Sequence, residues 1–81
     1  MRLSSEQRRA VIVTSACRIA TSRGLWAVTH GSVAARCTVP TSLNTVRHYF
    51  ATKDDLWRAV LVEESEHEAL HQQAREMGFE V

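Results

Sequence analysis

The chain has 81 residues, of which 44% are hydrophobic and 23% charged, and its formal net charge is +1 at pH 7. This length supports one domain with a single modest core, which argues against a large enzyme active site, and no apolar run is long enough to span a bilayer. We therefore expect a globular, soluble protein in the cytoplasm, because the polar start of the chain lacks the apolar segment of a secretory signal.

The small net charge hides an uneven distribution along the chain. Residues 1–58 hold nine Lys/Arg and three acidic residues, whereas residues 59–81 hold one Arg and six Glu. A basic part of this kind suits contact with a polyanion, and an acidic tail suits solvent. Two ordinary solvated faces are the alternative interpretation of the same counts.

The first predicted helix begins near Ser5 and ends at Gly24. Ser4 and Gln7 have the spacing of a capping box, in which each side chain bonds the backbone N–H of the other residue. Gly24 can adopt the left-handed conformation that commonly ends a helix. Apolar residues between these ends recur at helical spacing and predict one buried stripe: Ile12, Ala16, Ile19 and Ala20, flanked by Val13 and Cys17.

The cysteines and tryptophans are expected to be structural. Cys17 and Cys37 share no metal-site spacing and fall on predicted helices, so we expect buried apolar residues rather than a disulfide or a ligand pair. Trp26 and Trp57 border apolar helix stripes, which predicts that both pack in the core or at its edge. No cofactor is expected.

Two short helices follow, joined by a turn. Thr29 is the predicted cap of the second helix. Residues 38–42 are polar and interrupted by proline, which pushes the preceding residue out of helical geometry, so the chain must turn. Thr41 or Ser42 can then cap a third helix that continues to about Tyr49.

The third predicted helix has the character of a DNA-reading helix. Val46 and Phe50 lie four positions apart and would brace it against the core, while its polar residues point outward. Asn can pair bidentately with adenine and Arg with guanine, whereas Thr hydroxyls and Lys suit phosphates. The pattern favours a helix-turn-helix that places residues 42–49 in the major groove. A generic three-helix bundle with a polar surface is the alternative.

The fourth predicted helix begins after Thr52, which has capping-box spacing with Asp55, and it packs through Leu56, Trp57, Val60 and Leu61. Residues 63–68 are polar on every side, so no core contact is expected there. A weaker apolar set then predicts a frayed end, a fifth helix or a dimer contact: Ala69, Leu70, Ala74 and Met77. The chain therefore divides into a domain of residues 1–62 and an acidic helical extension of residues 63–81.

Residues 67–71, HEALH, match the H-E-x-x-H pattern, in which two His on one helical face bind zinc and the Glu acts as general base. A catalytic site also needs a third ligand and a cleft, which a segment outside the core does not offer. We therefore predict no metal site, no catalytic residue and no enzyme. His67 and His71 are interpreted as exposed side chains, with adventitious metal binding as the alternative.

Residues 45–56, TVRHYFATKDDL, resemble the stretch of the tetracycline-repressor (TetR) family in which the recognition helix ends and the next helix begins. Gly24, Thr29 and residues 33–36 fall where this family has its helix-ending Gly, its capping Thr and its second helix, so that the resemblance covers residues 8–62. It implies an all-α fold, a small bundle of four helices or five that contains a helix-turn-helix, and double-stranded DNA as the partner. Family members dimerise and bind effectors through a further helical domain, for which this length leaves no room, so no small-molecule effector is expected.

The resemblance also assigns roles to single residues. It implies phosphate contacts for Thr29 and Lys53. The side chains that would face DNA by resemblance are Thr45, Arg47, His48 and Tyr49. Helix position alone adds Thr41, Ser42 and Asn44 as candidates, and His30, at the start of the second helix, either contacts phosphate or is solvated. The sequence departs from the family in two ways, because the turn is longer and Arg47 stands where a phosphate-binding Tyr is common. Tyr49 has a second interpretation, in which its ring covers the core and only its hydroxyl meets water.

Two functions are consistent with these patterns. The first is a small DNA-binding transcription regulator without an effector domain. The second is a protein-interaction module that keeps the helix-turn-helix fold and uses it, or residues 63–81, to bind or inhibit a protein partner. A single DNA-reading unit makes few base contacts, so dimerisation through the C-terminal helix, or a protein partner, is expected to supply a second contact.

Overall fold

The structure, a computed structural model, describes residues 2–79, which form helices and no strand. The helices are α1 (Ser5–Arg23), the 3-10 turn η1 (Leu25–Ala27), α2 (His30–Arg36), α3 (Leu43–Tyr49), α4 (Lys53–Glu63) and α5 (Glu68–Glu76). The predicted all-α class is confirmed, and the fifth helix that the sequence left open is present. No helix in this range has the length and apolar character needed to cross a membrane.

α1 begins and ends where the sequence predicts. The Gln7 N–H donates to Ser4 Oγ at 3.1 Å and the Ser4 N–H donates to Gln7 Oε1 at 2.8 Å, which completes the capping box. At the other end Gly24 has φ 101° and ψ 157°, and a Cβ added there would lie 2.8 Å from the indole nitrogen of Trp26. Only glycine fits this backbone conformation and this close approach.

The prediction for Trp26 is wrong, because its side chain is 68% exposed. η1 points Leu25 into the core, where it is fully buried, and consecutive residues of a 3-10 turn lie about a third of a turn apart. The residue after Leu25 therefore faces outward. Trp57 is buried as predicted, and its indole N–H donates to the Val28 carbonyl at 2.9 Å.

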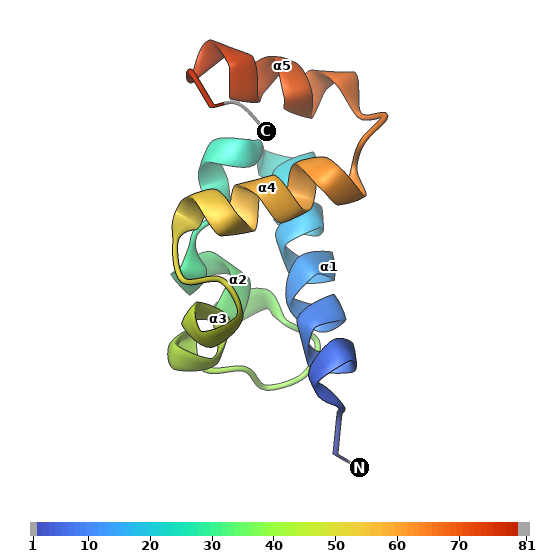
Figure 1. Cartoon of the computed structure of the whole chain (residues 1–81), viewed down its shortest axis with the longest axis vertical. Helices are drawn as coiled ribbons and strands as arrows, with labels where there is room; N and C mark the ends of the chain where they lie inside the picture. The colour runs from blue at the N-terminus through green and yellow to red at the C-terminus, as the bar shows by residue number, and fades with distance from the viewer. Residues whose placement is uncertain (1, 80–81) are drawn as a thin grey trace.

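The core lies where α4 crosses α1, with α2 and α3 together toward one end of the molecule and α5 at the other (Figure 1). Every residue predicted for the stripe of α1 and for the inner face of α4 is buried. One polar side chain, Ser15, is also buried, and its hydroxyl donates to the Val33 carbonyl at 3.1 Å, which ties α1 to α2. Burial raises the pKa of the Cys17 thiol to about 11, and Glu64 and Glu63 add to this rise.

The two cysteines differ in their surroundings. Cys17 is buried within α1, as predicted, whereas Cys37 ends α2 and is only half-buried. Both thiols are free, so neither forms a disulfide. The prediction of two buried residues holds for Cys17 and is wrong for Cys37, because the helix stops at Arg36 and the chain turns away.

The expectation that residues 63–81 lie outside the core is wrong for α5. Leu70 and Ala74 are 1% and 2% exposed, and the Leu25 N–H donates to Gln73 Oε1 at 2.8 Å. The Phe79 ring meets the Trp57 ring edge-on, with 5.7 Å between centroids. The polar stretch acts as a turn between α4 and α5, which lets α5 fold back over η1 (Figure 1).

Candidate nucleic-acid interface

Residues 37–42 connect α2 to α3, and the two helices pack against each other. This connection is longer than the turn of three to four residues that is usual in a helix-turn-helix, as the sequence indicated. Ser42 caps α3, since the Thr45 N–H donates to its Oγ at 3.1 Å. Thr41 does not cap the helix, because its hydroxyl donates to the Val39 carbonyl at 2.8 Å.

α3 has one buried side and one exposed side. Val46 is fully buried and Phe50 is 4% exposed, which is the bracing that the sequence predicts. The exposed residues of α3 are Leu43, Asn44, Arg47 and His48. Positions four apart lie on the same face of a helix, so the amide, guanidinium and imidazole groups share one surface.

Two further predicted contact residues of α3 are only partly available. Thr45 is half-buried, and its Oγ1 lies 2.9 Å from Ser42 Oγ, so these two hydroxyls hydrogen bond to each other. The Tyr49 ring is half-buried against the core and meets the His48 ring edge-on at 5.2 Å between centroids. The interpretation of Tyr49 as a ring that covers the core therefore describes its packing.

Thr29 and Lys53 lie at the starts of α2 and α4. Thr29 caps α2 in a reciprocal pair with Ser32, in which each side-chain oxygen accepts from the other residue's backbone N–H at 3.0 Å. Both Thr29 and Lys53 are exposed. The Lys53 ammonium lies 4.9 Å from the centroid of the Trp57 ring, a cation–π distance that holds this side chain against the protein surface.

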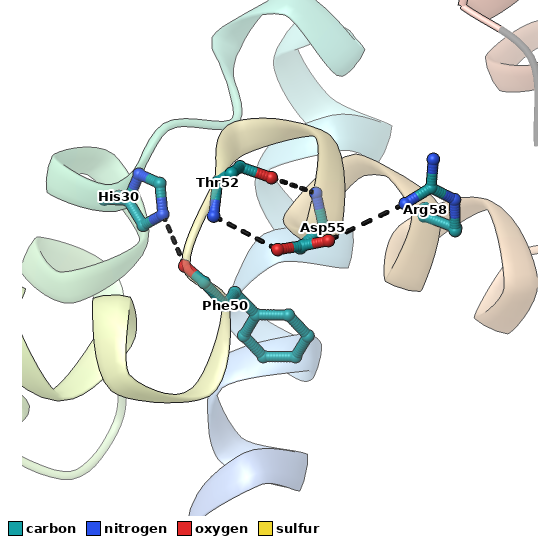
Figure 2. Close-up of polar contacts among 5 residues, drawn as sticks. All are labelled: His30, Phe50, Thr52, Asp55 and Arg58. Carbon is teal, nitrogen blue, oxygen red and sulfur yellow. Dashed lines mark hydrogen bonds and ion pairs between the residues drawn. The ribbon is translucent and has the colours of Figure 1, made fainter.

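His30 makes a contact that the sequence did not predict. Its side chain is half-buried, and its Nε2 lies 2.7 Å from the carbonyl oxygen of Phe50 (Figure 2). The Nε2 atom is therefore neither solvated nor free to contact phosphate. No local signal in the sequence could identify this partner, which is 20 positions away.

The sequence also gave no indication of a groove between α1 and α4. Its volume is about 550 Å³, and its apolar lining includes Val13, Phe50, Ala59 and Val62. Val62 is 64% exposed, and it lies outside the helical spacing that marked the buried face of α4. Arg9 stands at the edge of the groove with its guanidinium 4.9 Å from the Phe50 ring centroid.

The prediction that His67 and His71 are exposed is wrong, because both side chains are half-buried. His67 precedes α5 as its cap, and His71 Nε2 lies 3.1 Å from the Glu64 carbonyl oxygen. The Arg75 guanidinium donates to Glu68 Oε1 at 2.6 Å, which holds the pKa of that carboxyl below its usual value. Within residues 2–79 no three His, Cys, Asp or Glu side chains converge on a point where a metal ion could bind.

The polar residues of these elements thus fall into two groups. Asn44, Arg47 and His48 project from one face of α3, with the exposed Thr29 and Lys53 at neighbouring helix starts. Thr41, Ser42 and Thr45 are committed to hydrogen bonds that shape the start of α3. No protein-family model, curated protein or solved structure matches this chain.

Proposed function

We propose that this protein is a cytoplasmic, DNA-binding transcription regulator that places α3 in the major groove of double-stranded DNA. The observation that carries the proposal is the division of α3 into a fully buried Val46 side and an exposed side that holds Asn44, Arg47 and His48. A reading helix needs both, because the buried side fixes its angle and the exposed side meets the bases. The likeness of residues 45–56 to the TetR family supports the same proposal.

The exposed groups suit different parts of a DNA duplex. The Asn44 amide can donate to and accept from adenine, and the Arg47 guanidinium can bind both acceptor atoms of guanine. Thr29 and Lys53, at the starts of the flanking helices, are the candidates for phosphate contacts. Acidic side chains are absent from α3, which favours its approach to phosphate.

The test is the salt dependence of binding to a random DNA duplex, measured by fluorescence anisotropy. Each phosphate contact releases counterions, so the logarithm of affinity should fall linearly with the logarithm of salt concentration. Arg47→Ala and Lys53→Ala should each weaken binding, and Lys53→Ala should lower the salt slope by about 1. Arg23→Ala is the matched control, because it removes an exposed Arg from the C-terminal end of α1, outside the candidate reading unit of α2 and α3. If the native protein has no affinity for duplex at low ionic strength, the proposal is wrong.

The groove between α1 and α4 favours a second candidate function, a protein-interaction module. A hollow of about 550 Å³ with the apolar Val62 at its edge can accept an apolar side chain of a partner. Val62→Asp would disrupt such a contact and leave DNA binding unchanged. Ala69 on α5 and Met77, the residue that follows α5, are exposed, and they are the candidate surface for dimerisation through this helix.

A further inference from the structure

We infer that His30 is a positioning residue for α3, an inference that rests on the proposed function. The imidazole on the first residue of α2 reaches the carbonyl of Phe50, the residue that ends α3, with 2.7 Å between Nε2 and the oxygen (Figure 2). Among the hydrogen bonds of residues 2–79, this is the one that joins α2 to the end of α3. It links the two helices of the candidate reading unit at a single point.

The acceptor determines which form of the imidazole is present. A carbonyl oxygen can only accept, so Nε2 must carry a hydrogen. Both the neutral Nε2–H tautomer and the doubly protonated ring meet this requirement, and the neutral Nδ1–H tautomer does not.

The Phe50 carbonyl is held in place by the rest of its residue. The Phe50 N–H donates to the Val46 carbonyl at 2.9 Å, and the Phe50 ring is buried beneath the Arg9 guanidinium. Two residues later, Thr52 and Asp55 form the capping box of α4, with both hydrogen bonds at 3.2 Å. The start of α4 is thus held by the capping box of Thr52 and Asp55, which does not involve His30.

Within residues 2–79, no hydrogen bond other than that of His30 joins α2 to α3. Ser42 and Thr45 bond to each other at the start of α3, so they do not tie that helix to α2. α2 and α3 pack against each other, and the fully buried side chain of each is apolar, Val33 in α2 and Val46 in α3. Apolar packing is not directional. The hydrogen bond from His30 therefore adds a directional restraint to the apolar packing that holds α3, and His30 acts on the presentation of Arg47 through α3 rather than by contact with DNA.

The first experiment uses the native protein without DNA. The ¹⁵N chemical shifts of the His30 ring report which ring nitrogen carries a hydrogen, and a hydrogen on Nε2 is the expected result. A neutral ring with hydrogen on Nδ1 would overturn the inference, whether or not the protein binds DNA. A failure of the proposed function is thereby distinguishable from a failure of this one.

The second experiment compares His30→Ala with His30→Gln, whose amide N–H can donate from nearly the position of Nε2. We expect His30→Ala to speed amide hydrogen exchange in α3 and to weaken binding to a DNA duplex by roughly two- to tenfold, the effect of losing one net hydrogen bond. His30→Gln should restore both. Unchanged α3 exchange in His30→Ala, or weakened binding that His30→Gln does not rescue, would instead indicate a direct DNA contact or no role, and either result refutes the inference.

Discussion

Substitution of Leu70 by Ala tests whether α5 is part of the folded unit. The Leu70 side chain is 1% exposed and packs in the same cluster as η1 and α4, so its truncation removes apolar contacts and leaves a cavity. A buried Leu→Ala change costs roughly 2–5 kcal/mol. The total stability of a domain of this length is about 4–12 kcal/mol, from a typical value per residue. The variant should therefore lose a large fraction of its free energy of unfolding, which urea denaturation followed by circular dichroism measures.

Leu43→Ala is the matched control, because the same atoms are removed from a helical Leu that is 39% exposed. Its loss should stay below about 2 kcal/mol, since part of the Leu43 side chain remains in water in the folded state and its truncation leaves no enclosed cavity. If Leu70→Ala costs no more than Leu43→Ala, α5 does not belong to the core. A native protein in which α5 unfolds at a lower urea concentration than the other helices would contradict the reasoning equally well.

Three further predictions concern buried or strained groups. Iodoacetamide near neutral pH should modify Cys37 and spare Cys17, because burial raises the pKa of the Cys17 thiol from 9.0 to about 11. The folded state therefore keeps the Cys17 proton to a higher pH than the unfolded state does, so the free energy of unfolding should fall as pH rises from about 9 to about 11. Equal rates for the two thiols, read by mass spectrometry, would contradict this. Trp57→Phe should cost about 1–3 kcal/mol in urea denaturation, because the buried Val28 carbonyl loses its donor; a change near zero would indicate that water replaces the indole. Gly24→Ala should lower stability by about 1–3 kcal/mol through backbone strain, and an unchanged unfolding midpoint would refute that expectation.

Helix boundaries could be predicted from the sequence because they depend on neighbouring residues. Ser4 with Gln7 and Thr52 with Asp55 form their capping boxes within one helical turn, whatever the rest of the chain does. The two sides of α3 follow from the same local periodicity, since the spacing of Val46 and Phe50 already determines which residues are turned away.

Features that depend on distant parts of the chain could not be predicted in this way. Leu70 and Ala74 form a weak apolar pattern, and their burial depends on a turn that brings α5 over η1. Trp26 is exposed because it lies in a short 3-10 turn, which its own residue type does not predict. The acceptor of His30 becomes visible only once α2 and the end of α3 lie side by side. For Leu70, Ala74 and His30 a tertiary contact decides the outcome, whereas the exposure of Trp26 follows from the backbone conformation of η1.

The placement of α5 also has an electrostatic consequence at long range. The molecule is 40 Å long, with α5 and the acidic residues near Glu64 at one end and α3 toward the other (Figure 1). α5 and the turn before it, residues 64–76, hold four Glu and one Arg, whereas α3 holds one Arg and no acidic residue. This separation of charge contributes to an electric dipole, on which the field of a polyanion would exert a torque. At low salt this torque would turn the protein so that α3 approaches the polyanion first. Near physiological salt the Debye length is about 8 Å, so the alignment would act only at separations of about that distance.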